Sequence, residues 1–243
     1  MTAESVWRAW RGMGGLPEPS LPAAGERVVV VSAHPDDDVL AVGGLLHRLS
    51  RRGCELVLVR ASDGEASHPG SPTLGPEQLA AARRQELAHA LAELGHSGAE
   101  RVSLGLPDSR VGERPDELVR GLVPRLAGAA LVLAPWSGDG HPDHEACGRA
   151  ARTVVGDVLW EYPVWAWHWA RPPGDPATGP GAPLPWQRAA RLRLSGAEQR
   201  VKAAAIGCFR TQVAPLSDDP ADAVVLPADV LAHFDRPYEV VFT

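Results

Sequence analysis

Short apolar runs alternate with amphipathic segments over the first two thirds of the chain. The runs, such as residues 27–33, are rich in β-branched side chains and have no polar face, as expected of strands buried on both sides. The segments between them place apolar residues at helical spacing, and the first two end at Gly53 and Gly95. The pattern predicts strands at residues 27–33, 54–61, 101–104 and 130–134, and helices at residues 39–52, 76–94, about 115–126 and about 143–155.

Strands that alternate with helices are typical of a parallel sheet covered by helices on both faces. We therefore predict an α/β fold with a Rossmann-like, mostly parallel sheet and a small C-terminal cap. After Asp157 the pattern loosens into a tryptophan-rich segment, a Pro/Gly loop at about residues 171–185, a short strand, and a helix at residues 195–209. We interpret residues 1–243 as one domain, with an N-terminal extension over residues 1–25 and a variable cap with C-terminal elements over about residues 160–243.

Two tryptophans, Trp7 and Trp10, share one face of a short helical stretch in the N-terminal extension. Aromatic residues at this spacing favour packing against a core. We expect both side chains to pack against the domain, with a lid over a binding site as the alternative.

The composition suits one compact domain and argues against several classes of partner. Of the 243 residues, 44% are hydrophobic, and the formal net charge of -6 offers no basic field, so nucleic acid is not expected as a partner. No signal-like segment and no apolar run near the roughly 20 residues of a membrane span is present, so we predict neither. Three widely spaced cysteines, Cys54, Cys147 and Cys208, fit a reduced, cytoplasmic setting. A homo-oligomer stays an open alternative to a monomer.

The first predicted strand is followed directly by His34, Pro35, Asp36, Asp37 and Asp38. The carboxyl ends of parallel strands form the crevice in which open α/β sheets bind ligands. Acidic residues in the first turn of a helix complement its dipole, which accounts for one or two of the aspartates but not for three beside a histidine. Adjacent carboxylates repel one another, so such a run is costly in a buried crevice unless a cation or a proton lies among them.

A second cluster, His141, Pro142, Asp143 and His144, lies between the strand that ends at Ala134 and the next helix. It therefore belongs at the same edge of the sheet. Histidines three residues apart at a helix start occupy neighbouring positions on one face. Packing does not explain the same His-Pro-Asp sequence at two strand ends, so we predict that the two clusters form one site.

Zinc fits these ligand types. Imidazole and carboxylate suit this metal, and catalytic zinc keeps about three protein ligands and an open position for water. A carboxylate that is not a ligand can act as the general base when the water attacks a carbonyl, and a further histidine, if protonated, can stabilise the oxyanion or protonate the leaving amine. Spacing alone does not decide which carboxylate binds and which takes the proton.

These residues resemble the LmbE/PIG-L family of zinc-dependent N-acetylglucosaminyl deacetylases, whose signature sequences are Ala-His-Pro-Asp-Asp-Glu and, later, His-Pro-Asp-His. Residues 33–38 and 141–144 match them in order. Weaker family-like features extend over most of the chain, and together they are specific: Ser62 to Glu65, Arg83 and Glu86 ahead of Leu94-Gly95, Leu106 to Asp108, and Lys202 ahead of Thr211-Gln212.

The resemblance implies removal of an N-acetyl group from a small-molecule aminosugar conjugate, with a role for each clustered residue. The implied zinc ligands are His34, Asp37 and His144. Asp36 is implied as the general base, and His141 as the oxyanion or acid partner, oriented by Asp143. Asp38 departs from the family glutamate; we expect the shorter side chain still to cap the helix, with an altered bond to the site.

Substrate contacts are expected downstream of the second cluster. Four tryptophans fall close together at positions 160, 165, 167 and 169, and we expect most to pack in the core or cap. Trp165, His168 and Arg83 are the predicted substrate contacts. Cys147 is expected to be a small buried thiol. The histidines presumed to be solvated are His47, His89, His96 and His233.

Three other functions remain open on these residues. An amidase of the same family type that cleaves a thiol-sugar conjugate would use the same metal chemistry. A magnesium-dependent phosphohydrolase is suggested by Asp36 and Asp38 after a strand, but it leaves three histidines unexplained. The third is a catalytically inactive sugar-binding module, against which the intact base and ligands argue.

Overall fold

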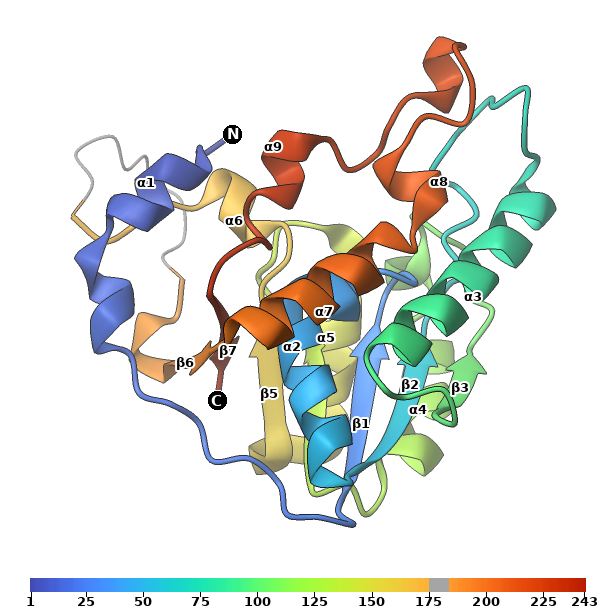
Figure 1. Ribbon diagram of the computed structural model, residues 1–243. Coiled ribbons are helices and arrows are strands. Elements are labelled where there is room, and N and C mark those ends of the chain that lie inside the picture. Colours follow the sequence, from blue (N-terminus) through green and yellow to red (C-terminus); the bar gives the residue numbers. More distant parts are fainter. Residues whose placement is uncertain (175–183) are drawn as a thin grey trace.

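A seven-stranded sheet forms the centre of the computed structural model, which describes residues 1–174 and 184–243 (Figure 1). The strand order is β3-β2-β1-β4-β5-β7-β6; β1 to β5 are parallel, and β7 pairs antiparallel with β5 and β6. The mostly parallel sheet expected from the sequence is confirmed. Residues 175–183 of the expected Pro/Gly loop lie outside the described residues. The strands are β1 (Arg27–Ser32), β2 (Glu55–Arg60), β3 (Glu100–Ser103), β4 (Leu131–Pro135), β5 (Leu159–Tyr162), β6 (Ala189–Arg193) and β7 (Tyr238–Phe242).

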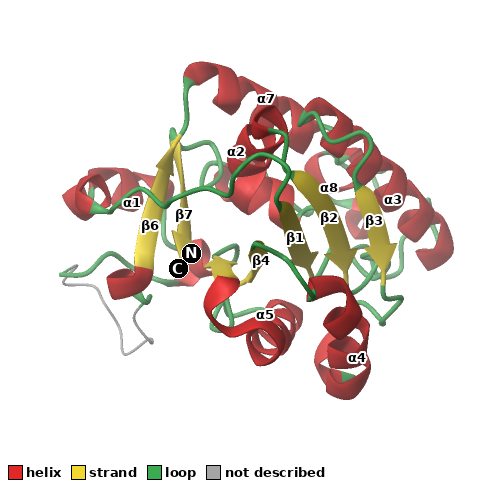
Figure 2. Ribbon diagram, turned by 90° about the horizontal axis from the view of Figure 1, so that it is seen from below, coloured by secondary structure: helices red, strands yellow, loops and turns green. Residues whose placement is uncertain are grey.

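Helices cover both faces of the sheet (Figure 2). The side chains of β1 alternate between two cores: Val28 and Val30 pack on one face, and Val29 and Val31 on the other. Both faces of the strand are therefore apolar, which explains the unbroken run in the sequence. One face carries α2 (Asp37–Arg52), α3 (Pro76–Glu93) and α7 (Gly196–Gly207), and the other carries α4 (Pro115–Leu126) and α5 (Pro142–Val155).

The C-terminal part contributes to the sheet as well as to the cap. The tryptophan-rich segment begins in β5, which extends the parallel sheet, and β7 and β6 add the antiparallel edge. The short helices α6, α8 and α9 lie above the carboxyl ends of the parallel strands (Figure 1). The remaining helices are α1 (Glu4–Ala9), α6 (Ala166–Trp169), α8 (Arg210–Val213) and α9 (Ala228–Leu231), with 3-10 turns at Arg11–Gly15, Val111–Glu113, Gly156–Val158, Trp186–Arg188 and Pro220–Asp222. None of the helices in the described part of the chain is long and apolar enough to cross a membrane.

Helix α2 begins two residues before its expected start and is broken at Val42, where φ is -132° and ψ is 22°. The break frees backbone N–H groups, and the carboxylate of Glu239 in β7 accepts those of Gly44 and Leu45, both at 2.7 Å. The Nζ atom of Lys202 in α7 lies 2.8 Å from the same carboxylate. A buried ion pair thus joins α2, α7 and β7 at the break.

The N-terminal tryptophans pack against the domain, as expected. Trp7 is fully buried, and its Nε1 atom donates to the carbonyl oxygen of Trp167 at 3.0 Å. Trp10 is partly buried and lies against Trp7 and Trp186.

Two of the four histidines that we presumed to be solvated are instead buried. The Nε2 atom of His96 lies 2.7 Å from the carbonyl oxygen of Leu46. The Nδ1 atom of His233 lies 2.8 Å from Glu4, which also accepts from Arg236. A helical pattern does not reveal such contacts because the partners come from distant segments.

Candidate active site

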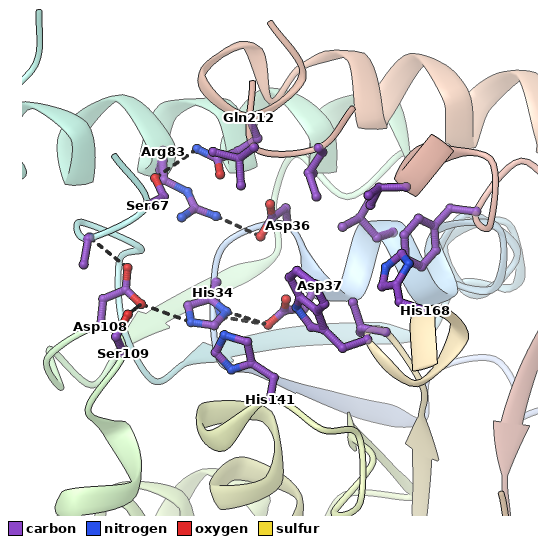
Figure 3. Close-up of a pocket in the computed structure, with 18 residues that line it drawn as sticks. His34, Asp36, Asp37, Ser67, Arg83, Asp108, Ser109, His141, His168 and Gln212 are labelled. Carbon is purple, nitrogen blue, oxygen red and sulfur yellow. Dashed lines mark hydrogen bonds and ion pairs between the residues drawn. The ribbon is translucent and has the colours of Figure 1, made fainter. Parts of the chain in front are cut away.

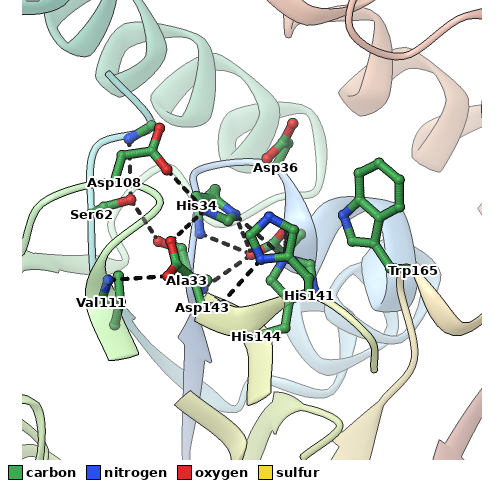
Figure 4. A network of polar contacts seen from close by, with 12 residues as sticks. Ala33, His34, Asp36, Ser62, Asp108, Val111, His141, Asp143, His144 and Trp165 are labelled. Carbon is green, nitrogen blue, oxygen red and sulfur yellow. Dashed lines mark hydrogen bonds and ion pairs between the residues drawn. The ribbon is translucent and has the colours of Figure 1, made fainter. Parts of the chain in front are cut away.

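The two predicted clusters meet at the carboxyl ends of β1 and β4, which are neighbours in the sheet. Strand β1 pairs with β2 on one side and with β4 on the other, so the strand order reverses here and a crevice opens. The loop after β1 carries His34, and the start of α5 carries His144. Figure 4 shows the side chains of both clusters converging at this point.

His34, Asp37 and His144 are buried, and their ligand atoms lie within 4.8 Å of one another. The Nε2 atom of His144 is 3.1 Å from Asp37 Oδ1 and 3.3 Å from His34 Nδ1. Asp37 Oδ2 accepts the backbone N–H groups of Ala33 and His34, which fixes the carboxylate. Two ring nitrogens and one carboxylate oxygen therefore face a common point, as a metal ion requires.

The far nitrogen of His34, the ring nitrogen that does not face His144, is held by two carboxylates. Nε2 lies 3.1 Å from Asp108 and 3.4 Å from Asp143. Asp108 in turn accepts the N–H group of Ala66, and Asp143 accepts that of Val111. A proton on Nε2 leaves Nδ1 as the ligand atom.

The far nitrogen of His144 is held by Asp139, whose Oδ2 atom lies 2.7 Å from Nδ1. Asp139 is completely buried, and it also accepts the backbone N–H groups of Val164, Trp165 and Ala166 at 2.8 to 3.0 Å. One carboxylate thus orients a candidate metal ligand and the start of α6.

The charge of the cluster favours a cation. Four carboxylates, those of Asp37, Asp108, Asp139 and Asp143, are buried around His34 and His144. Burial opposes protonation of His144, but the charge of Asp37 and hydrogen bonds to Asp139 and Asp37 raise its pKa to about 9. The pKa of His34 is likewise raised against burial, by Asp37, Asp108 and Asp143. Protons on these rings balance the carboxylates, and a divalent cation at the same atoms would displace them.

A second group of possible ligands consists of His34, His141 and Asp143. The resemblance implied that Asp143 orients His141. Its backbone N–H group donates to His141 Nδ1 at 3.3 Å, while its carboxylate contacts His34 and the N–H group of Val111. Because Nδ1 accepts, neutral His141 carries its proton on Nε2. Burial, followed by the charges of His144 and His34, lowers the pKa of His141 to about 4, so the ring is neutral at pH 7.

Asp36 lies beside the ligands and is paired with Arg83. The guanidinium donates to Asp36 Oδ1 at 2.8 Å and to the carbonyl oxygen of Gly64 at 2.9 Å. Gly64 has a φ of +71°, and a Cβ atom there would lie 1.9 Å from Arg83 Nη1. Arg83, expected as a substrate contact, therefore also positions the predicted base.

Asp38 is buried, and neither of its carboxylate oxygens has a hydrogen-bond partner among the described residues. The helix cap expected from this side chain is therefore not formed. Burial and the neighbouring charge of Asp37 raise the pKa of Asp38 to about 8.

A cavity of about 150 Å³ opens beside these residues (Figure 3). Asp108 and Ser109 lie on the opposite side of it from His168. Trp165 lines it with 38% of its surface exposed, and its ring centroid lies 6.0 Å from that of His141. His168 is buried, and its Nδ1 atom has no partner among the described residues. The predicted contacts Trp165, His168 and Arg83 thus all line one cavity.

Sequence reasoning assigned no role to Asp139 and noted Asp108 only as part of a family-like segment. Their position in the sequence could have indicated a role, because both residues follow parallel strands at the sheet edge that holds the histidines. Their hydrogen bonds depend on segments far away in the chain.

Comparison with known proteins shows the family of the chain. Residues 29–155, about half of the chain, match the PIG-L family, described as GlcNAc-PI de-N-acetylase. The chain belongs to the PIG-L family. A relative from Kineococcus radiotolerans, named 1D-myo-inositol 2-acetamido-2-deoxy-alpha-D-glucopyranoside deacetylase, is 28% identical over 237 residues, which cover 83% of this chain and 61% of the relative. The PIG-L chain thus spans about three fifths of that protein.

Two solved structures have a similar fold. N,N'-diacetylchitobiose deacetylase from Pyrococcus horikoshii is 21% identical with a TM-score of 0.56, and the match covers 76% of this chain and 70% of that one. The 4-carboxy-2-hydroxymuconate hydratase GalB from Pseudomonas putida is 22% identical with a TM-score of 0.57, covering 77% and 80%. Since a hydratase shares the fold, the reaction has to be argued from the site.

Proposed function

We propose that this PIG-L protein is a zinc-dependent hydrolase that removes an N-acetyl or related N-acyl group from a glucosamine-containing substrate. The observation that carries the proposal is the convergence of His34, Asp37 and His144 beside the carboxylate of Asp36. Carboxylates contact the second ring nitrogen of each histidine, and backbone N–H groups donate to Asp37. Such contacts to the ligands are typical of a prearranged metal site.

The donor set fits zinc, and His34, Asp37 and His144 would hold it. When bound, zinc lowers the pKa of water towards about 7 and polarises an acyl oxygen. We prefer this set to His34, His141 and Asp143 because the far nitrogens of His34 and His144 are both held by carboxylates. His141 has no such carboxylate contact among the described residues.

Asp36 would act as the general base. Its Oδ1 atom accepts from Arg83, which leaves Oδ2 to take a proton from the attacking water and then to pass it to the leaving amine. Neutral His141 would donate its Nε2–H to the acyl oxygen as negative charge develops there. Trp165 and His168 would contact the sugar, with the indole face covering its apolar side.

Two alternative functions differ in which residues of the site they would leave without a role. A magnesium phosphohydrolase would leave the facing ring nitrogens of His34 and His144 without a role, because magnesium prefers oxygen ligands. An amidase for a thiol-sugar conjugate would use the same machinery on another substrate. We also propose a cytoplasmic location, since Cys54, Cys147 and Cys208 are all free.

Metal analysis combined with acetate release tests the proposal. We expect about one zinc per chain and release of acetate from at least one N-acetylglucosamine conjugate. His144→Ala should lose both, whereas His89→Ala, which changes an exposed histidine on α3, should keep both. Asp36→Asn should keep zinc and lose turnover. Loss of zinc from Asp36→Asn would show that the two carboxylate roles are reversed, and unchanged zinc in His144→Ala would end the proposal.

A further inference from the structure

The cavity beside the candidate metal ligands has two unlike sides. One side is polar, and its lining residues are His34, Asp36, Asp37, Ser67, Arg83, Asp108, Ser109, His141 and Gln212. The other is built from aliphatic and aromatic side chains that come from α2, from the turn just before α6 and from the segment around α9. His168 marks the second side, because its ring centroid lies 4.8 Å from that of His233 in this segment. The apolar wall consists of Leu40, Val164, Val225, Leu226, Val230 and Phe234.

Six apolar side chains form this wall, and most of them are well packed. Leu40, Val164, Val230 and Phe234 expose only 2 to 5% of their surface, so they are packed in place rather than lying loosely at a rim. A polyol bound against such a surface would give up water from its hydroxyl groups without gaining hydrogen bonds there. An apolar substituent would instead be removed from water at no such cost.

The cavity is also poorly suited to an anion. Among its described lining residues, Arg83 is the only lysine or arginine, and its two Nη atoms already donate to Asp36 and Gly64. Asp36, Asp37 and Asp108 line the same cavity. A phosphate or carboxylate on the substrate, held away from the metal ligands, would meet these carboxylates without a free lysine or arginine to pair with.

We propose that the substrate of this protein carries an uncharged apolar substituent that packs on the apolar wall, next to the amide that is cleaved. The inference rests on the proposed deacylase function and narrows its substrate class. The apolar group can come from either of two sources: an aryl or alkyl aglycone on the sugar, or an acyl chain longer than acetyl. Both require the same wall.

Phe234 limits the length of the substituent that the cavity can hold. It also lines a second cavity of about 260 Å³, whose other apolar lining residues include Ile206, Val213 and Leu231. Phe234 therefore lines both cavities, and the second also carries Lys202, Asp235 and Arg236. Truncation to alanine should join the two and allow longer substituents to bind.

Four substrates separate the possibilities: the phenyl glycoside of N-acetylglucosamine, its inositol conjugate, its 1-phosphate, and N-octanoylglucosamine. With the zinc-loaded enzyme, we expect kcat/KM for the phenyl glycoside or the octanoyl amide to exceed that of the inositol conjugate about tenfold, with the phosphate slowest. Faster hydrolysis of the phenyl glycoside would identify the aglycone as the apolar group, and faster hydrolysis of the octanoyl amide would identify the acyl chain. Equal or faster hydrolysis of the inositol or phosphate conjugate than of both apolar substrates would overturn the inference while leaving the deacylase function intact.

Variants test the wall itself. Val230→Thr keeps the side-chain shape and replaces a methyl group by a hydroxyl group, so kcat/KM for the preferred apolar substrate should fall about tenfold further than kcat/KM for the inositol conjugate. Val241→Thr, at a valine of similar burial in β7 outside the cavity, is the control for lost stability. Phe234→Ala should shift the preference towards longer chains. Equal losses on both substrates in Val230→Thr would contradict a role of the wall in recognition.

Binding to the Asp36→Asn protein separates failure of the inference from failure of the function. If no substrate is cleaved by the wild type but the phenyl glycoside or the octanoyl amide still binds Asp36→Asn about tenfold more tightly than the inositol conjugate, the deacylase function fails and the apolar site stands. If neither binds more tightly, the apolar site is refuted as well.

Discussion

Replacing Asp139 by asparagine removes one negative charge and turns one of two acceptor atoms into a donor. Oδ1 accepts from the N–H groups of Val164 and Ala166, and Oδ2 accepts from that of Trp165 and contacts His144 Nδ1. An amide has only one oxygen, so its nitrogen replaces one of the two acceptors. In one orientation the N–H groups of Val164 and Ala166 lose their acceptor; in the other, the N–H group of Trp165 loses its acceptor and the nitrogen faces His144 Nδ1.

The magnitude follows from the number of donors that lose their acceptor. A buried donor left without an acceptor costs about 1–3 kcal/mol, so the loss of one or two acceptors should lower the free energy of unfolding by about 1–6 kcal/mol. If the amide nitrogen takes the place of Oδ2, His144 must accept at Nδ1 and carry its proton on Nε2, the atom that faces Asp37. If it takes the other place, His144 keeps its tautomer but loses the charge that increases its basicity. Substitution of a residue that hydrogen-bonds to a metal ligand typically lowers the affinity for the metal about 10- to 100-fold.

Zinc affinity measured by competition with a chelator is the decisive assay, with thermal unfolding measured in parallel. Asp222→Asn is a matched control, because Asp222 is also completely buried and accepts from Ser71, Thr73 and Ser217 but contacts no candidate ligand. We expect lower stability in both variants and weaker zinc binding only in Asp139→Asn. Zinc affinity of Asp139→Asn within about twofold of the wild type would refute the assigned role of Asp139.

Three further outcomes are expected. Gly64→Ala should displace Arg83 and lower kcat about 10-fold or more with zinc content unchanged, since its Cβ atom would lie 1.9 Å from the guanidinium; normal kcat would contradict the contact. Zinc affinity should rise with pH up to about 9, because below that value zinc displaces a proton from His144; a flat titration would argue against this ligand. Burial opposes ionisation of Glu4, but hydrogen bonds from His233 and Arg236 lower its pKa from 4.5 to about 2. Its contribution to stability is therefore complete above about pH 4.5 and is lost as the pH falls towards 2, so the stability gap between wild type and Glu4→Gln, measured by denaturant unfolding, should close over that range.

The parallel part of the fold could be predicted because its strands are buried on both faces and its helices end at glycines. The later strands lack those signals. β5 contains Glu161, a charged residue that argues against a buried strand until Arg152 and Arg188 are brought to it by folding. Only the tertiary structure shows that this charge is paired.

The same limit applies to the site. His34, Asp37 and His144 could be predicted because strand ends converge at one edge of a parallel sheet. Asp139 lies between two glycines and has the local pattern of a turn. Its importance depends on three N–H groups of residues 164–166, which lie more than 20 residues away.

The break in α2 has a mechanical consequence. A straight helix of 16 residues would be a rod about 24 Å long, and any tilt of its far end would be transmitted to Asp37 in its first turn. The break at Val42 separates that turn from the rest of the rod, and Glu239 anchors the junction to β7. We therefore expect movements and substitutions at the distal end of the helix to have little effect on the position of the Asp37 carboxylate.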